Sequence, residues 1–284
     1  MIVGSQSTRH PTMPALAAAV PAPTAATNDL PAAAHPAVRL RVLTLNLHKG
    51  FSALNRRFVL HEIRAAVRLV GADVVFLQEV LGAAPPPHGA RGEKVTAPQY
   101  EFLADSIWQQ HAYGHNAVSP SGHHGNALLS KYPILTHRNI DVSVHGREPR
   151  GLLHCVLDVP GLAQPLHAVC VHLGLSESQR RLQIGQLCRL IDAEVPPRAP
   201  VVVAGDFNDW RLRGHRQLEQ GCALVDVHAH SRGRPARTFP ARHPLLRLDR
   251  IYVRDARLHD PIMLPRRPWS HLSDHTPLAA EVTL

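Results

Sequence analysis

The chain has 284 residues, of which 44% are hydrophobic, and its 31 Lys and Arg against 22 Asp and Glu give a formal net charge of +9 at pH 7. This hydrophobic share is ordinary for a globular protein and excludes collagen-like, coiled-coil and wholly disordered chains. No run of eighteen hydrophobic residues is free of charges and prolines, so we expect no transmembrane segment. The positive charge favours polyanionic partners such as nucleic acid or acidic lipid headgroups.

Residues 1–37 are rich in Ala, Pro and Thr and poor in large apolar side chains. The prolines at positions 11, 14, 21, 23, 31 and 36 forbid a continuous helix there. Such a segment buries too little apolar surface to offset chain entropy, so we expect a disordered leader over residues 1–37 and a single folded domain over residues 38–284. The leader lacks the cationic start and unbroken apolar run of a secretory signal, which favours a cytoplasmic location.

After the leader, short apolar runs alternate with amphipathic stretches. We expect helices over residues 56–70, 99–110 and 176–193, the last opened by Ser176 and Gln179 at the spacing of a capping box. Loops over residues 82–98 and 232–244 are long enough to be functional. Seven runs rich in Val, Leu and Ile have the length of buried strands, over residues 39–47, 73–80, 126–130, 152–159, 166–173, 200–207 and 246–253.

The cysteines and paired histidines give no metal-binding pattern. The four cysteines, at positions 155, 170, 188 and 222, fit neither a CxxC motif nor a dense disulfide framework, so we interpret them as buried thiols. The histidines at 123–124 and 228–230 lack the partners of an HExxH motif or of a Cys/His cluster, so we interpret them as loop residues.

Polar residues stand where four of the expected strands end, and more acidic and histidine residues follow near the end of the chain. In sheets flanked by helices, ligands bind where the strands end, because loops converge there. One such residue alone is more often a cap for the next turn, but the set together indicates a site. Its members are Asn46, Glu79, His172, Asp206, Asn208, Asp249, Asp274 and His275.

Six sequence segments together carry a resemblance to a known family. The segments LNLHKG, LQEV, VHLG, GDFND, LDRIYV and SDHTPL, in this order and at roughly these spacings, resemble the endonuclease/exonuclease/phosphatase family of metal-dependent phosphoesterases. Further segments, HHGNALLS and GRPARTFP among them, resemble a bacterial branch of that family. The resemblance covers residues 39–284 and implies a DNase I-like four-layer α/β sandwich, in which two mixed β-sheets pack face to face between helices.

A phosphodiester is an anion, so its hydrolysis requires neutralisation of its oxygens and a positioned water. Glu79 is the first candidate ligand for Mg²⁺ or Mn²⁺, which favour oxygen donors. The resemblance adds Asn46 and Asp274 as direct or water-bridged ligands.

The resemblance also implies roles for the catalytic residues. Asp206 orients or deprotonates the water, and Asn208 donates to the phosphate. Asp249 pairs with His275, and either Asp206 or His275 is the general base. His172 donates to the transition state.

Three further residues are candidate contacts for the substrate phosphate. Lys49 follows the first strand, Asn126 precedes an expected strand, and Arg150 stands before a glycine. Each has an ordinary alternative. Asn126 is equally expected to form a turn, an arginine such as Arg150 is more often a solvated surface charge, and for Lys49 contact and no contact are about equally expected.

We therefore expect a metal-dependent phosphoesterase that cleaves a phosphodiester, with nucleic acid favoured as substrate over a phospholipid headgroup. Residues 211–250 hold nine Arg against three acidic residues, which supports the hypothesis of a nucleic-acid substrate. A GC-rich genome also produces many arginines. The alternative is a phospholipid or sphingomyelinase-like phosphodiesterase or phosphatase. A non-catalytic binding scaffold is a minor alternative, because such a scaffold is expected to have lost a site residue and all are present.

Overall fold

The structure is a computed structural model, and it describes residues 1, 37–53, 57–82, 97–105, 107–119 and 122–284, with the side chains of residues 119 and 257–260 left aside. The expected leader, apart from its two end residues, and most of the expected loop over residues 82–98 lie outside the described residues.

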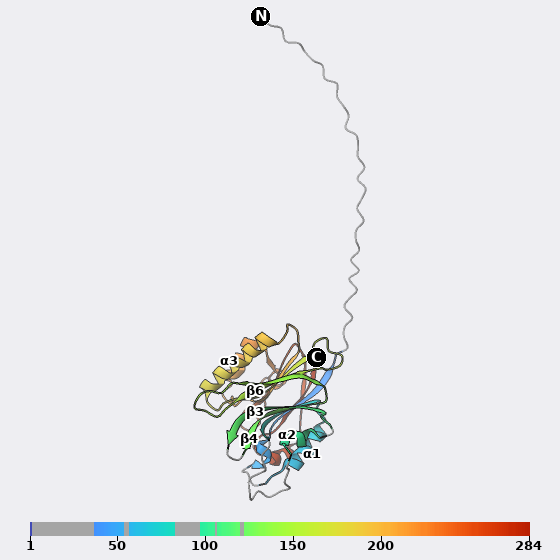
Figure 1. The fold of residues 1–284 in the computed structure, drawn as a ribbon, viewed down its shortest axis with the longest axis vertical. Coiled ribbons are helices and arrows are strands. Elements are labelled where there is room, and N and C mark those ends of the chain that lie inside the picture. Colours follow the sequence, from blue (N-terminus) through green and yellow to red (C-terminus); the bar gives the residue numbers. More distant parts are fainter. Residues whose placement is uncertain (2–36, 54–56, 83–96, 106, 120–121) are drawn as a thin grey trace. The chain divides into compact units, whose positions relative to one another are not determined.

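Two six-stranded mixed sheets form the centre of the domain, as expected (Figure 1). In the first sheet the strand order is β11-β12-β1-β2-β4-β3, and in the second it is β5-β6-β7-β8-β10-β9. Within each sheet a single described pair is parallel, β1 with β2 and β7 with β8. The first sheet contains β1 (Arg39–Asn46), β2 (Val74–Leu81), β3 (Gln110–Ser119), β4 (Gly122–Ser130), β11 (Arg257–Ile262) and β12 (Leu278–Thr283). The second contains β5 (Ile134–Asp141), β6 (Gly151–Leu157), β7 (Leu166–His172), β8 (Val201–Asp206), β9 (Val225–Asp226) and β10 (Asp249–Arg254).

The central strands are buried on both faces, which explains their continuous apolar runs. Val42 and Phe76 of the first sheet belong to one buried cluster with Cys155 and Ile251 of the second, so the sheets pack against each other. Two further clusters lie on the outer faces, where helices cover the sheets. Figure 1 shows α3 on one side of the strands and α1 and α2 on the other. The expected four-layer α/β sandwich is confirmed.

The helices follow the expected positions in part. They are α1 (Leu60–Val70), α2 (Gln99–Ala104), α3 (Glu177–Glu194), α4 (Arg213–Cys222), α5 (Val227–Arg232) and α6 (Arg266–Leu272), with a 3₁₀ turn η1 (His48–Gly50). The capping box of Ser176 and Gln179 opens α3, as predicted. The prediction of a helix over residues 99–110 is wrong beyond Ala104, because Gln110 begins an edge strand paired with β4.

The interpretation of all four cysteines as thiols is wrong for two of them. Cys188 on α3 and Cys222 at the end of α4 form a disulfide, whereas Cys155 and Cys170 are buried thiols. A separation of 34 residues gives no sequence signal, because the packing of the two helices on the second sheet brings the sulfurs together. In the part of the chain that is described, no helix has the length and apolar character needed to span a membrane.

Candidate active site

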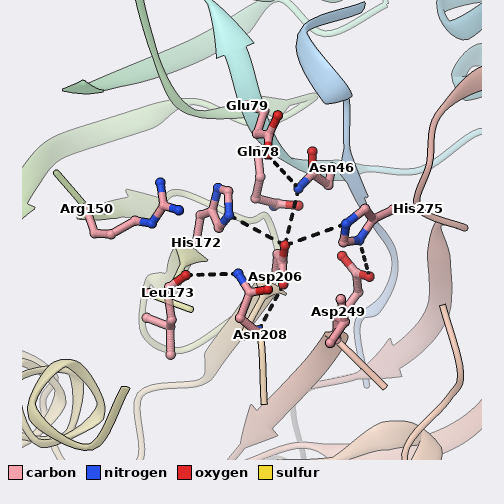
Figure 2. A network of polar contacts seen from close by, with 12 residues as sticks. Asn46, Gln78, Glu79, Arg150, His172, Leu173, Asp206, Asn208, Asp249 and His275 are labelled. Carbon is pink, nitrogen blue, oxygen red and sulfur yellow. Dashed lines mark hydrogen bonds and ion pairs between the residues drawn. The ribbon is translucent and has the colours of Figure 1, made fainter. Parts of the chain in front are cut away.

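The site lies at the edge where the two parallel strand pairs end. Asn46, the last residue of β1, pairs with Gln78 of β2 in the first sheet. In the second sheet His172, the last residue of β7, pairs with Asp206, the last residue of β8, and Asp249 at the start of β10 lies opposite Asp206. The registers of both sheets therefore bring these polar side chains to one edge (Figure 2).

Asp206 occupies the centre of the site and is 1% exposed. Its Oδ2 atom lies 3.2 Å from Nδ2 of Asn46, 3.5 Å from Nε2 of His172 and 3.9 Å from Nε2 of His275. Its Oδ1 atom accepts a hydrogen bond of 2.9 Å from the backbone N–H of Asn208. Burial raises the pKa of Asp206 to about 7, although the charge of His275 opposes the rise. The carboxylate thus joins groups from both sheets.

The GDFND turn that carries Asp206 depends on two unusual backbone conformations. Gly205 has φ of 148°, and a Cβ there would lie 2.0 Å from the carbonyl oxygen of Val171, so only glycine fits. Asn208 has φ of 51°, a left-handed conformation that asparagine tolerates. Its Nδ2 donates to the carbonyl oxygen of Leu173 at 3.0 Å. Asn208 therefore fixes the loop after β7 in addition to holding Asp206.

His275 forms a buried pair with Asp249, as the family resemblance implied. Its Nδ1 lies 2.8 Å from Oδ2 of Asp249, and the ring packs against Phe239 with 5.0 Å between centroids. Burial lowers the pKa of His275, but the charge of Asp249 and its hydrogen bond, followed by Asp206 and Asp274, outweigh burial and raise the pKa to about 10. His275 is therefore an imidazolium at neutral pH.

His172 and Arg150 lie on the opposite side of Asp206 from His275 (Figure 2). Burial, followed by the charge of Arg150, holds the pKa of His172 well below its usual value, so this ring is neutral at pH 7. Arg150 is 5% exposed and pairs with Glu148 at 2.8 Å, while its Nε atom has no hydrogen-bond partner among the described residues. The expectation of a solvated Arg150 is wrong, and the buried guanidinium directs positive charge into the site.

Asn46 and Glu79 form the part of the site contributed by the first sheet. The N–H of His48 donates to Oδ1 of Asn46 at 3.0 Å, so Nδ2 is turned toward Asp206 and toward Oε1 of Glu79, 3.5 Å away. Glu79 has φ of 53° and lies in an irregularity of β2. Strained backbone at such a position accompanies functional sites. Asn46 thus bridges two carboxylates across the sheets.

Asp274 completes the set of residues predicted to bind metal. Its Oδ1 lies 3.3 Å from Oγ of Ser273 and 3.6 Å from Nδ1 of His48, and its side chain is 29% exposed. Among the described residues, neither Glu79 nor Asp274 pairs with Lys or Arg. Carboxylates that pair with no Lys or Arg fit a hard divalent cation such as Mg²⁺ or Mn²⁺.

A second group has the spacing of metal ligands. Within the described ranges, the group of His, Cys, Asp and Glu whose ligand atoms all lie within 4.8 Å of one another consists of Asp206, Asp249 and His275. In this group Nδ1 of His275 is already bonded to Asp249. One potential ligand atom of this group is therefore already engaged in a hydrogen bond, whereas Glu79 and Asp274 have the freer oxygens.

The contacts of the other two candidate phosphate ligands, Asn126 and Lys49, are with other parts of the fold and not with Asp206. Asn126 lies within β4 and is fully buried, so the expectation of a turn residue is wrong. Its Nδ2 donates to the carbonyl oxygens of Gly151 at 2.9 Å and Cys170 at 3.3 Å, which links the two sheets. Lys49 lies in η1 directly after β1, with φ of 56°, and its carbonyl oxygen accepts from Gln99 at 2.8 Å.

Two positioning residues were not found by sequence reasoning. The Oγ of Thr238 accepts from the N–H of Asp249 at 3.2 Å. The Oγ of Ser273 donates to the carbonyl oxygen of Asn46 at 2.7 Å and accepts from the N–H of His275 at 3.2 Å. Both lie inside quoted motifs, GRPARTFP and SDHTPL, which were the available signal.

A comparison with known families decides the relationship of the chain. The description of the matching family is "Endonuclease/Exonuclease/phosphatase family", and the match covers residues 43–275. The chain belongs to the endonuclease/exonuclease/phosphatase family. This family generally consists of hydrolytic phosphoesterases. All residues of the site described above lie within the matched residues.

This endonuclease/exonuclease/phosphatase chain is also similar to individual proteins, in sequence or in fold. It is 52% identical over 246 residues to "Uncharacterized protein YbhP" of Escherichia coli K12, which covers 86% of this chain and 96% of the relative. A solved endonuclease/exonuclease/phosphatase structure from Beutenbergia cavernae has a TM-score of 0.71 at 22% identity, covering 87% of this chain and 72% of that one. D. rerio TDP2, complexed with a single-strand DNA product, has a TM-score of 0.61 at 21% identity, covering 86% and 98%. The two structures share the fold.

Proposed function

We propose that this protein is a Mg²⁺- or Mn²⁺-dependent hydrolase of phosphodiesters, with Asp206 at its catalytic centre. The observation that carries the proposal is the set of contacts to Oδ2 of Asp206. Asn46, His172 and His275 approach this one atom to between 3.2 and 3.9 Å, from both sheets. Neither sheet alone could assemble a carboxylate, a neutral imidazole and an imidazolium at one point.

Glu79 and Asp274 would hold the metal directly, and Asn46 would do so through water, because its amide oxygen already accepts from His48. When bound, the metal neutralises charge on the phosphate and lowers the pKa of a water molecule. The buried guanidinium of Arg150 provides a second positive charge across the site from His275.

Within this arrangement we assign the general base to Asp206 rather than to His275. The hydrogen bond between Nδ1 of His275 and Asp249 leaves Nε2 as a donor, suited to a phosphate oxygen or a departing oxygen. Burial raises the pKa of Asp206 to about 7, near the value at which a general base works best at neutral pH. His172 donates to the transition state, and Asn208 holds Asp206 and offers its remaining amide hydrogen to the phosphate.

The test is turnover of bis-nitrophenyl phosphate by the full-length protein. Activity should disappear with EDTA and return with Mg²⁺ or Mn²⁺. Asp206→Asn and Glu79→Gln should each lower turnover by roughly 10²-fold or more, the scale of a lost acid–base group. Glu62→Gln, an exposed glutamate of α1, is the matched control and should retain full turnover. Full activity in EDTA, or in Asp206→Asn, would contradict the proposal.

For the substrate we propose nucleic acid. The loop after α5 carries several exposed arginines without ion pairs among the described residues, and the related TDP2 structure contains a single-strand DNA product. A phospholipid headgroup is the second candidate. It is favoured by two exposed apolar side chains on the site loops, Leu175 after β7 at 62% and Trp210 after β8 at 40%.

Parallel assays of a soluble oligonucleotide and a short-chain, monomeric phospholipid under the same metal conditions separate these substrates. We expect cleavage of the oligonucleotide, with an apparent affinity that weakens as salt is raised. Cleavage of the lipid alone would reverse the order of the two candidates and leave the catalytic residues as assigned.

A further inference from the structure

A cavity of about 400 Å³ lies beside the active site, outside the catalytic residues. Its walls come from α5, from the loop that follows α5, from the end of β11 and the two residues after it, and from residues 276–278, which lead into β12. Its size is within the range of small-molecule sites. None of the residues assigned to catalysis or metal binding lines it.

One side of the cavity is strongly basic. Arg234, Arg237 and Arg247 line it together with Arg232, no acidic residue lines it, and none of the four forms an ion pair with any residue in the described ranges. Arg247 uses its Nε to donate to the carbonyl oxygen of Pro235 at 2.9 Å, which fixes the guanidinium at the wall. Burial, and then Arg237 and Arg234, lower the pKa of Arg247, so the three charges repel one another. An anion would relieve this repulsion.

Two buried polar atoms of the lining are without partners. Nδ1 of His228, a residue that is 8% exposed, has no hydrogen-bond partner among the described residues, and neither does Oγ1 of Thr276. Buried polar groups in folded proteins are nearly always hydrogen-bonded, because an unpaired one costs about 1–3 kcal/mol. Both residues belong to the lining of this one cavity, so its wall contains two polar groups that the described protein atoms do not satisfy.

Another part of the lining is apolar. Ile262, Met263 and Leu264 line it together with Pro277, and the Met263 side chain is 74% exposed. Exposed apolar surface next to unpaired guanidinium groups fits a molecule with an anionic end and an apolar body. Free inorganic phosphate would leave this apolar side in contact with water.

The cavity wall is also joined to the catalytic segment. Thr276 follows His275 directly, and its N–H donates to the carbonyl oxygen of Thr238 at 2.8 Å. The side chain of Thr238 in turn accepts from the N–H of Asp249. A ligand in the cavity therefore contacts the loop that holds the His275–Asp249 pair.

We propose that this cavity binds a phosphate group that carries an apolar substituent, with Arg234, Arg237 and Arg247 bound to the phosphate and Ile262 to Leu264 in contact with the substituent. Guanidinium groups bind phosphate through paired, charge-assisted hydrogen bonds. A phosphate group with an apolar substituent is found either in a distal part of the substrate or in a separate organic phosphate. The inference goes beyond the proposed hydrolysis and does not depend on metal.

Calorimetric titration of phenylphosphonate into the full-length protein in EDTA tests the proposal. Its carbon–phosphorus bond is not a phosphate ester, so binding is read without turnover. We expect saturable binding that is tighter than that of inorganic phosphate, because the phenyl ring contacts the apolar side. Arg234→Ala/Arg237→Ala should weaken binding by roughly tenfold or more, the scale of one lost charge-assisted hydrogen bond. Arg234→Lys/Arg237→Lys should restore part of it.

Two controls locate the binding. Arg189→Ala/Arg216→Ala removes the same charge from exposed positions on α3 and α4 and should leave the affinity unchanged. His172→Ala alters the active site and should also bind phenylphosphonate normally. The proposal is overturned by an absence of binding to the wild type, by equal binding in the Arg234→Ala/Arg237→Ala variant, or by loss of binding only in His172→Ala.

Kinetics in the presence of phenylphosphonate distinguish the two sources. If the cavity holds a distal part of the substrate, the compound raises KM for an oligonucleotide without changing kcat, and leaves bis-nitrophenyl phosphate unaffected. If the cavity holds a separate molecule, kcat changes for both substrates alike. A wild type that binds phenylphosphonate but cleaves no phosphodiester would contradict the proposed hydrolysis while supporting the cavity.

Discussion

Two buried histidines on the second sheet should make the folded protein sensitive to acid. His154 of β6 and His167 of β7 are each 5% exposed, and Nε2 of His154 lies 2.9 Å from Nδ1 of His167. Two imidazole nitrogens at this distance form a hydrogen bond only when one of them carries a proton. Protonation of the acceptor nitrogen would place two N–H groups against each other, and a charge on either ring would be buried away from solvent, so the pair favours neutral rings.

The pKa of His167 gives the size of the loss in unfolding free energy on acidification. Burial, then the charges of His154 and Arg254, lower the pKa of His167 from 6.5 to about 4. The unfolded chain therefore takes up this proton near pH 6.5, whereas the folded protein resists it down to about pH 4. The free energy of unfolding must fall as the pH drops from 6.5 toward 4, and the loss from His167 alone is about 2 kcal/mol at pH 5. Burial also lowers the pKa of His154, which acts in the same direction.

Urea unfolding at pH 7.5 and pH 5.0 measures this effect. On acidification the His154→Gln/His167→Gln variant should lose about 2 kcal/mol less than the wild type, because glutamine does not titrate. His137→Gln, at an exposed histidine of β5, is the control and should behave as the wild type. Equal losses in the wild type and in the double variant would refute the reasoning, whatever their stabilities at pH 7.5.

Three further predictions concern the fold. Gly205→Ala should lower the free energy of unfolding by more than about 3 kcal/mol, or prevent folding, because its Cβ would meet the carbonyl oxygen of Val171; urea unfolding checks this. Cys188→Ser/Cys222→Ser should lower the same quantity by about 2–5 kcal/mol, and a reductant should then have no effect on the variant while it destabilises the wild type. Deletion of residues 1–37 should leave Tm and turnover nearly unchanged, since that segment has little apolar surface to bury, and a large fall in Tm would contradict this.

The parts of the fold that the sequence predicts are those with one dominant physical signal. β8 is buried on both faces, so its run of Val and Ala is visible directly. β5 is exposed along almost its whole length and has no such run, so its sequence, ILTHRNID, resembles a loop. β3, an edge strand with small and polar residues, has no such run either and is not predicted by the sequence, and the helix expected over residues 99–110 overlaps it only at Gln110.

The residues of the candidate site likewise divide into those with a local sequence signal and those without one. Asp206 and His172 were found because they interrupt or end apolar strands, which is a local feature. The contacts of Thr238 and Ser273 depend on loops that meet only in the folded chain, and no local pattern records them. The orientation of Asn46, whose amide nitrogen faces Asp206 across the two sheets, likewise needs residues 160 positions apart.

The disulfide has a consequence for the active site because of where its ends lie in the sequence. Cys188 precedes β8 and Cys222 follows it, so the 34-residue loop that they close contains the GDFND turn. Asp206 therefore belongs to a covalent ring, whose two ends cannot separate when α3 or α4 opens locally. Disulfides persist in oxidising compartments and are reduced in the cytosol. The redox state of the surroundings thus determines whether the central carboxylate is carried by a closed ring or by an open chain.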